Sequence, residues 1–453
     1  MKRLTALTAL LCTAALAAGC SSDASRSRGD AATLATGAPA ETSLPSGPVH
    51  LVMWWWGDQE APGAKEWLAE TVAAYHKEHP NITIETVLQT TDGLIPGFQA
   101  AAAAKQGPDL QYFWGGIYSQ QPAWAGSIVP VSDYVPEKEL KHYLNAAAED
   151  TYDGKILTAP WYVNPQFPVL VRKDVLAEHG LDVPTTWDDF MKACDTLHAA
   201  GVTTIAGGVK DGWFGGWLFS MLGAQTLDSQ TDVTDAVVGD KKFTDDEQAE
   251  WWTRLQETRT HHCWNDDINS LELYQAQQRW VSGDAAMTIT AGTDAPNFVD
   301  KVGADKVAIT TMPTFGDGPF AGKMATTSQT IGITSWSKYP QVGASFIEFM
   351  HSPDRLQAFY DKTGVMPADD RFDVSKVTDP TKKQLFDMAL QGSPYIENYI
   401  PVELDSNAVF TNVQLVLQGS RSGKEAAADM QQQMDRLRTK DRSLAKNFEA
   451  WAG

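Results

Sequence analysis

The first part of the chain alternates short apolar runs with amphipathic stretches. The runs VHLVMWW and ITIETVL have strand length, and the stretch between them repeats apolar residues at helical spacing. An Ala-rich stretch and a third run, DLQYF, follow. The elements are expected at 49–55, 64–78, 82–88, 94–105 and 109–113. This strand–helix order predicts a parallel sheet with helical crossovers.

The rest of the chain changes pattern several times. The middle is helical, beginning near Thr186, which is a good helix N-cap. Strand-like runs return at 285–292, 307–313 and 330–335, and helical stripes dominate after Gln341. This order predicts an α/β fold of two lobes between which the chain crosses more than once. Each lobe is expected to hold a mainly parallel sheet flanked by helices, with a small-molecule cleft between the lobes.

The N-terminus carries the pattern of an export signal. Lys2 and Arg3 precede an apolar segment that is too short for a permanent membrane helix, and LAAGC ends at Cys20. That ending resembles a bacterial lipobox, which implies lipidation of Cys20. The alternative is an ordinary secretory peptide cleaved nearby. Residues 21–48 are rich in Ser, Ala, Gly, Pro and Thr, which predicts a flexible tether.

Composition narrows the class of protein. The chain has 453 residues, of which 43% are hydrophobic and 21% charged, as in globular proteins. The formal net charge of -21 argues against nucleic acid as a partner and against broad adhesion to anionic lipid. We therefore expect membrane contact through a lipid anchor only.

Four cysteines are present, but Cys12 and Cys20 belong to the signal region. Cys194 and Cys263 remain, and an exported pair can form a disulfide. The alternative is that Cys194 is a core residue, because it lies on the apolar stripe of Phe190 and Leu197. The sequence does not decide between the two. No second cluster accompanies HHC at 261–263, so we expect no metal site and no cofactor.

Three consecutive tryptophans end the first predicted strand. A strand buried on both faces would absorb Trp54, Trp55 and Trp56. Alternatively, the strand ends at Trp56 and leaves 57–60 at the carboxyl edge of the sheet, where ligands bind in open α/β folds. The third strand ends in a similar stretch, WGGIYSQQPAW (114–124), with aromatic, Gly and amide residues. This coincidence favours the second interpretation.

Four segments resemble the solute-binding lipoproteins of carbohydrate ABC transporters, the broad group that contains the maltose-binding protein. They are YDGKILTAPWYV (152–163), LAEHGLDVPTTWDDFMKACDTL (176–197), QRWVSGDAAMTITAGTD (278–294) and ASFIEFMHSPDRLQAFYDKTGVMPA (344–368). The resemblance implies a two-lobed periplasmic-binding-protein-like fold. Two departures are ATTSQT after residue 324, where the family often has Gly-Gly-Trp, and Arg172, where it often has Asn.

The pattern and the resemblance together divide the chain. We expect a signal peptide at 1–19, a tether at 20–48, a first lobe at 49–162 and 293–335, and a second lobe at 163–292 and 336–453. The mature protein is expected to be a monomer at the extracellular face of the cell membrane, held by its lipid. Its partners would be an oligosaccharide and the permease of an ABC importer.

Sugar sites combine aromatic rings, which lie on C–H faces, with carboxylates and amides for the hydroxyls. The candidate ligand contacts are Trp56, Asp58, Gln59, Glu60, Trp114, Trp161, Tyr162, Trp213, Phe214, Asp294 and Ser328. For each aromatic the alternative is core packing, and for Asp58 and Glu60 it is a solvated surface position. Loop glycines favour a ligand role for Trp114 and Trp213. We expect no catalysis; the alternatives are an exported carbohydrate-active enzyme or a binding protein for a non-sugar solute.

Overall fold

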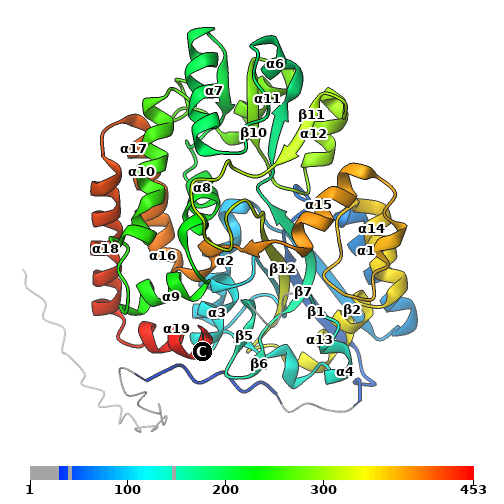
Figure 1. Cartoon of the computed structure of the whole chain (residues 1–453). Coiled ribbons are helices and arrows are strands. Elements are labelled where there is room, and N and C mark those ends of the chain that lie inside the picture. The colour runs from blue at the N-terminus through cyan, green and yellow to red at the C-terminus, as the bar shows by residue number, and fades with distance from the viewer. Residues whose placement is uncertain (1–29, 39–42, 145–148, 453) are drawn as a thin grey trace, which may run out of the picture.

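The computed structural model describes residues 30–38, 43–144 and 149–452, which build two sheets surrounded by helices (Figure 1). The larger sheet contains β1 (Val49–Trp55), β2 (Ile82–Leu88), β3 (Leu110–Phe113), β4 (Ile128–Val129), β7 (Ala159–Gln166), β12 (Ala325–Thr334) and β13 (Ser393–Pro394). The smaller sheet contains β8 (Val169–Arg172), β9 (Thr203–Ala206), β10 (Ala285–Ile289) and β11 (Val307–Thr310). A separate hairpin pairs β5 (Thr151–Tyr152) with β6 (Lys155–Ile156).

The predicted βαβαβ unit is present, since β1 pairs in parallel with both β2 and β3. Elsewhere the sheets are mixed. Strand β12 runs antiparallel to β3, β4 and β7. In the smaller sheet only β9 and β10 are parallel, whereas β8 is antiparallel to β10 and to β11. The prediction of mainly parallel sheets is therefore wrong for the smaller sheet. An apolar run predicts a strand but not the direction in which it pairs, so the sequence did not distinguish a parallel β8 from an antiparallel one.

Helices cover both sheets. Those near the larger sheet include α1 (Ala64–Glu78), α2 (Thr91–Ala104), α3 (Ile117–Trp124), α4 (Glu137–Leu140), α13 (Pro340–Met350) and α14 (Pro353–Thr363). The others are α6 (Lys173–Glu178), α7 (Trp187–Ala199), α8 (Phe214–Gly223), α9 (Thr231–Val238), α10 (Asp246–Thr260), α11 (Leu273–Ser282), α12 (Ala295–Val302), α15 (Pro380–Leu390), α16 (Val402–Leu404), α17 (Thr411–Gln418), α18 (Gly423–Lys440) and α19 (Leu444–Ala452). A π-helix, Asp405–Phe410, connects α16 to α17.

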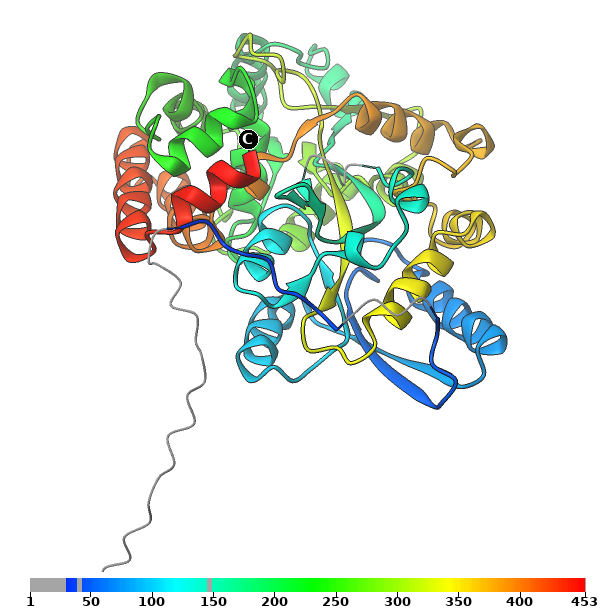
Figure 2. The ribbon, with the colours of Figure 1, turned by 90° about the horizontal axis from the view of Figure 1, so that it is seen from below.

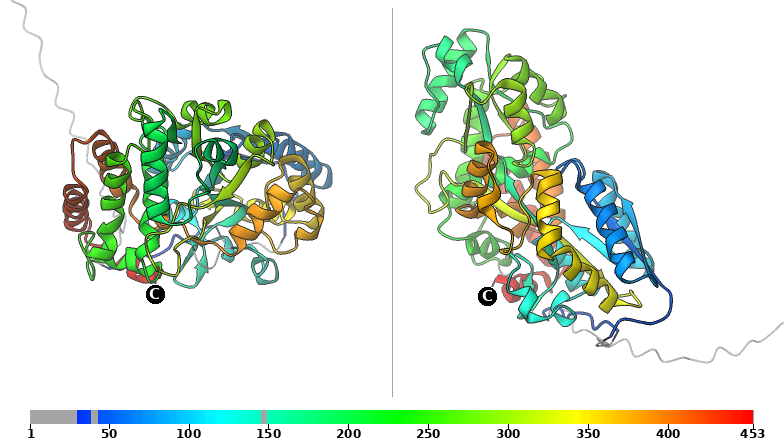
Figure 3. Two further views of the ribbon diagram at one scale, coloured as in Figure 1. Left: turned by 45° about the horizontal axis from the view of Figure 1, so that its top comes forward. Right: turned by 90° about the vertical axis from the view of Figure 1, so that its right-hand side faces the viewer.

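The packing assigns several segments to a different lobe from the one expected. Helices α13 and α14 share a core with α1 and the larger sheet, although 336–453 was expected in the second lobe (Figure 3). Strand β11 belongs to the smaller sheet and α12 packs on α11, although 293–335 was expected in the first lobe. The apolar stripes predicted the helices themselves, but a stripe does not say which sheet it will cover.

Part of the expected tether lies against the body. Residues 30–38 and 43–48, here called the N-terminal strap, run along the underside of the molecule beside α19 (Figure 2). The Ala32 N–H donates to Asn447 Oδ1 at 2.6 Å, and Asn81 Nδ2 donates to the carbonyl oxygens of Pro45 and Gly47 at 2.7 and 2.8 Å. The prediction of a free tether is therefore wrong for these residues. The predicted signal peptide, Cys20 and residues 21–29 lie outside the described residues.

Cys194 on α7 forms a disulfide with Cys263, which follows α10. Both residues are fully buried, so the disulfide is itself part of the core. Within the described ranges, none of the helices combines the length and the apolar character that crossing a membrane requires.

Candidate ligand-binding site

Trp56 lies just beyond β1 and supports the rings in front of it. Its ring centre is 5.9 Å from that of Tyr112 and 5.5 Å from that of Trp114. Its indole Nε1 donates to Thr91 Oγ1 at 3.0 Å, at the start of α2. Only 6% of Trp56 is exposed. Trp56 therefore braces its neighbours and offers little surface of its own to a ligand.

Trp114 and Tyr118 are the partly exposed rings of this group, with ring centres 5.4 Å apart. Trp114 follows β3 and Tyr118 lies in the first turn of α3, as the glycine pair at 115–116 allows the chain to turn sharply between them. The two rings border a hollow of about 460 Å³, a volume that includes solvent at its mouth. Side chains of α2, β3 and α3 and Val402 of α16 line it.

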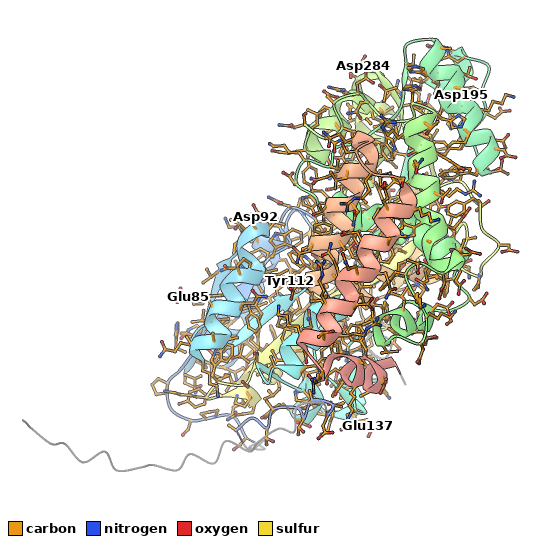
Figure 4. The ribbon with its side chains drawn as sticks, turned by 90° about the vertical axis from the view of Figure 1, so that its left-hand side faces the viewer. Glu85, Asp92, Tyr112, Glu137, Asp195 and Asp284 are labelled. Carbon is orange, nitrogen blue, oxygen red and sulfur yellow. A yellow bond between two sulfur atoms is a disulfide. The ribbon has the colours of Figure 1, made fainter. Side chains whose placement is uncertain are left out.

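Residues from opposite sides of the molecule approach one another above these rings. Burial, then Glu272 and, more weakly, Asp92 raise the pKa of Asp211, although Lys210 opposes them. Asp92 belongs to α2 of the larger-sheet lobe and lies on its edge toward the second lobe (Figure 4). Asp211 precedes α8. The Asp92 charge thus acts on Asp211, so the beginning of α2 lies near the beginning of α8, and we take the space between these helix starts as the candidate cleft.

Two carboxyl groups also come together in this cleft. Asn164 Nδ2 of β7 donates to Glu60 Oε2 at 2.8 Å. Burial, and next the negative charge of Asp294, raise the pKa of Glu60 to about 8. Burial likewise raises the pKa of Asp294, at the start of α12, to about 6, although Lys301 opposes the shift. The loop after β1 thus meets the start of α12.

A second aromatic group lies on the side of the smaller sheet. The ring of Trp213 is 5.0 Å from that of Trp217 and 5.8 Å from that of Tyr274. Tyr274 is 44% exposed. Partial burial, followed by the charges of Glu60 and Asp294, raises the pKa of the Tyr274 hydroxyl. Tyr274 therefore connects the second aromatic group to the carboxyl pair.

Four predicted contacts lie in the core instead. Trp161 is 4% exposed and its ring packs on Trp67 and Phe359. Tyr162, Phe214 and Ser328 are also buried, and Ser328 sits inside β12 opposite Val163. The structure therefore gives these side chains little or no exposed surface, and their contact with a ligand stays a prediction.

The remaining residues of the loop after β1 differ in their exposure and in their hydrogen bonds. Asp58 Oδ1 accepts a hydrogen bond of 3.2 Å from the Lys65 N–H and so helps to satisfy the first turn of α1. Gln59 is exposed. Gly57 has a φ of 120°, and a Cβ there would lie 2.6 Å from the Tyr162 hydroxyl. The loop therefore requires glycine at this position, and buried Tyr162 shapes the site indirectly.

The sequence did not single out Thr91, Tyr118, Asn164 and Tyr274, which complete the site. Tyr118 stands within the aromatic and amide-rich stretch that was noted, so the signal was present. Tyr274 lies within the capping box that Glu272 and Gln275 form at the start of α11. Tyr274 does not lie on the apolar stripe of its helix, and this could have marked it as a surface residue.

Residues 70–383 match the family of bacterial extracellular solute-binding proteins. The chain is a bacterial extracellular solute-binding protein. Among curated relatives, an ABC transporter extracellular-binding protein of Pyrococcus horikoshii is 27% identical over 28% of this chain and 30% of its own length. The sn-glycerol-3-phosphate-binding periplasmic protein of Escherichia coli is 27% identical over 48% of this chain and 50% of its own. The matches thus span half or less of these relatives.

Solved structures of similar fold cover nearly the whole body of this solute-binding protein. A chitin oligosaccharide binding protein superposes with a TM-score of 0.77 at 22% identity, covering 86% of this chain and 98% of its own. A protein from a study of xylan utilization by the bacterium Caldanaerobius polysaccharolyticus gives a TM-score of 0.72 at 23% identity, covering 85% and 99%. These likenesses establish the two-lobed fold.

Proposed function

We propose that this solute-binding protein captures an oligosaccharide in the cleft and delivers it to the permease of an ABC importer. The observation that carries the proposal is the pairing of two partly exposed aromatic groups with carboxyl and amide groups between them. Trp114 and Tyr118 lie on one side, and Trp213 and Tyr274 on the other. Successive sugar rings can stack on such platforms while their hydroxyls bind the polar groups. The names of the structurally similar proteins support a sugar as the ligand.

A thermal-shift screen against a panel of oligosaccharides tests this proposal. A ligand present at 100 times its Kd stabilises the native state by about 2.7 kcal/mol, which raises the melting temperature measurably. Xylo-, malto-, cello- and chito-oligosaccharides form the sugar arm, and sn-glycerol 3-phosphate and an oligopeptide form the control arm. Stabilisation by the controls alone would contradict the proposal.

A second candidate is a glycoside hydrolase, because Glu60 and Asp294 form the kind of carboxyl pair that such enzymes use. The family of this chain consists of binding proteins, which favours binding without chemistry. Incubation with the oligosaccharides that stabilise the protein, followed by chromatography of the products, separates the two candidates. Turnover that disappears in Glu60→Gln would establish the enzyme.

Lobe closure and anchoring complete the proposed function. We expect the lobes to close about the segments near 160–168 and 286–293, as in other hinged binding proteins. Small-angle scattering should then show a smaller radius of gyration with ligand than without. We also propose lipidation of Cys20, a monomeric state and a position outside the cell membrane. Cys20→Ala should release the protein into the medium, and retention on the membrane would contradict lipidation.

A further inference from the structure

The Gly292 N–H donates to the Pro165 carbonyl oxygen at 2.9 Å, which brings the segment that ends in Asp294 beside Asn164 and the Glu60 carboxyl group that Asn164 binds. Among the described residues, neither Glu60 nor Asp294 forms an ion pair.

Three lysines of this region have other partners. Lys210 binds Glu272 at 2.9 Å, and Lys301 lies over the ring of Phe298 at 5.3 Å. Lys382 lines a small cavity with Thr293 and lies over the ring of Tyr360 at 6.0 Å. Lys301 favours the charged form of Asp294 but does not reach it as a salt bridge. The pair lacks a counter-charge from the protein.

A buried acceptor beside this pair also lacks a partner. Asn164 is completely buried and its Nδ2 donates to Glu60, but its Oδ1 accepts no hydrogen bond from the part of the chain that the structure describes. Thr293 Oγ1, one residue before Asp294, is likewise unpartnered. Buried acceptors in native proteins are almost always satisfied, so an unsatisfied one calls for an explanation. Here the Asn164 Oδ1 is an acceptor and the Thr293 hydroxyl can accept or donate, and both adjoin a carboxyl group.

We propose that a protonated amine of the ligand binds between Glu60, Asp294 and Asn164, so that the solute is an amino sugar oligosaccharide. This inference rests on the proposed function and names the class of sugar. An ammonium group has three donors and no acceptor. Two carboxylate oxygens and the Asn164 Oδ1 supply three acceptors, and the exposed ring of Tyr274 offers a face for the cation or the sugar.

A neutral sugar fits this set of groups less well. A hydroxyl donates one hydrogen bond and carries no charge, so it would leave two carboxyl groups facing each other in a closed cleft. In the empty protein the repulsion is relieved by protonation, because the pKa of Glu60 is about 8. An amine takes the place of that proton. Binding near neutral pH should therefore release a proton to solution.

The experiment uses three trisaccharides with the same β-1,4-linked backbone. They are the glucosamine trimer, its N-acetylated form and cellotriose, which differ only in the group at carbon 2. Isothermal titration calorimetry at pH 7 should show the glucosamine trimer binding at least about tenfold tighter than the other two, because a charge-assisted hydrogen bond is roughly twice as strong as a neutral one. Titration at about pH 6, where the sugar amines are already protonated, in two buffers of different ionisation enthalpy should show net proton release for the glucosamine trimer alone.

Matched variants then locate the amine. Glu60→Gln keeps the shape of the side chain but removes its charge, and it should abolish both the tenfold preference and the proton release. Asp294→Asn should weaken the preference. Glu85→Gln is the control, because Glu85 is exposed on β2 and pairs with His50 at 3.4 Å, on the outer side of the larger-sheet lobe (Figure 4). It should behave like the wild-type protein.

The outcomes separate this inference from the proposed function. If cellotriose or the acetylated trimer binds as tightly as the glucosamine trimer, the inference fails and oligosaccharide binding stands. A preference for amine that survives Glu60→Gln also overturns it. If spermidine binds and no sugar in the panel does, both the amino sugar and the proposed oligosaccharide function are wrong. If none of these probes binds, the amino sugar inference is rejected, and the thermal-shift screen with the wider oligosaccharide panel decides the proposed function.

Discussion

The indole ring of Trp56 meets the ring of Trp114 nearly edge-on, with ring centres 5.5 Å apart and ring planes at 77°. This contact and the burial of Trp55 explain two of the three consecutive tryptophans. Trp55 points into the core and is 2% exposed, whereas Trp56 follows the strand and braces the ring that borders the cleft. At the carboxyl edge of the sheet, the ring of Trp56 thus fixes the position of the ring of Trp114. Trp114 therefore needs little reorganisation to bind a ligand.

Trp114→Ala should therefore weaken ligand binding with a small effect on folding. The ring is partly exposed, so its removal empties little core volume. The comparison is Trp280→Ala on α11, because Trp280 is fully buried against Phe298. Trp280→Ala should cost about 3–5 kcal/mol of unfolding free energy. Urea unfolding and calorimetry with a stabilising oligosaccharide measure the two effects.

The two variants should have opposite effects on ligand affinity and on stability. Trp114→Ala should keep nearly the wild-type urea midpoint but bind more weakly, and the folded fraction of Trp280→Ala should bind normally. A Trp114→Ala protein that is strongly destabilised yet binds the sugar as the wild type does would place Trp114 in the core and reject its role as a platform.

The sequence predicted elements better than it predicted exposure. Trp114 and Trp161 both lie near the end of an apolar run, and both were proposed as ligand contacts. The structure separates them because Trp161 packs on Trp67 of α1 and Phe359 of α14, almost 200 residues further along the chain. A local pattern contains no information about that distant helix. For the same reason the stripes predicted α13 and α14 but not the sheet that they cover.

The stability of the protein should fall as the pH rises from about 5 to about 8.5. Burial raises the pKa of Glu149 to about 8, of Asp150 to about 7 and of Glu397 to about 7. These groups hold their protons more tightly in the native state than in the unfolded chain. Their contribution to the free energy of unfolding is thus fully present below about pH 4 and is lost as the pH rises through 7 to 8. Each unit of difference corresponds to about 1.4 kcal/mol.

Melting temperatures by circular dichroism at pH 5.5, 7 and 8.5 check this prediction. Asp369 has a pKa of about 2, so it stays ionised throughout and does not alter the slope. The variant Glu149→Gln retains an oxygen that can accept the 2.7 Å hydrogen bond from Thr327 Oγ1. It should melt with a shallower dependence on pH. A flat wild-type profile would mean that these carboxyl groups have ordinary pKa values.

The disulfide should contribute a few kcal/mol. It joins residues that are 69 positions apart, and for a loop of that length the chain-entropy account gives about 4 kcal/mol. The double variant Cys194→Ala/Cys263→Ala should have a lower unfolding free energy in urea by about that amount. Reductant should lower the stability of the wild-type protein toward that of the variant and leave the variant unchanged. Wild-type stability that does not respond to reductant after unfolding and refolding would contradict the prediction.

The N-terminal strap shortens the distance over which the body can move from an anchor at Cys20. Residues 20–29 span at most about 35 Å when fully extended, whereas the whole of 20–48 would span about 100 Å. The strap attaches beside α19 through the Ala32–Asn447 hydrogen bond, and it continues to Asn81 on the larger-sheet lobe. A lipid on Cys20 would therefore hold the underside of the molecule toward the membrane.

Removal of the strap should accordingly destabilise the folded body. We expect a chain that starts at residue 49 to lose about 2 kcal/mol of unfolding free energy relative to a chain that starts at residue 30. The reason is that each lost hydrogen bond contributes about 0.5–1.5 kcal/mol and ordering the strap costs part of that gain.

The variant Asn447→Ala in the chain starting at 30 should lose a part of the same stability, because Asn447 Oδ1 accepts from the Ala32 N–H. In the chain starting at 49 the Ala32 N–H is absent, so the same substitution should change the unfolding free energy less. Urea midpoints of the four proteins complete a double-mutant cycle. Additive effects would show that the strap does not interact with Asn447 in solution and would return residues 30–48 to the role of a free tether.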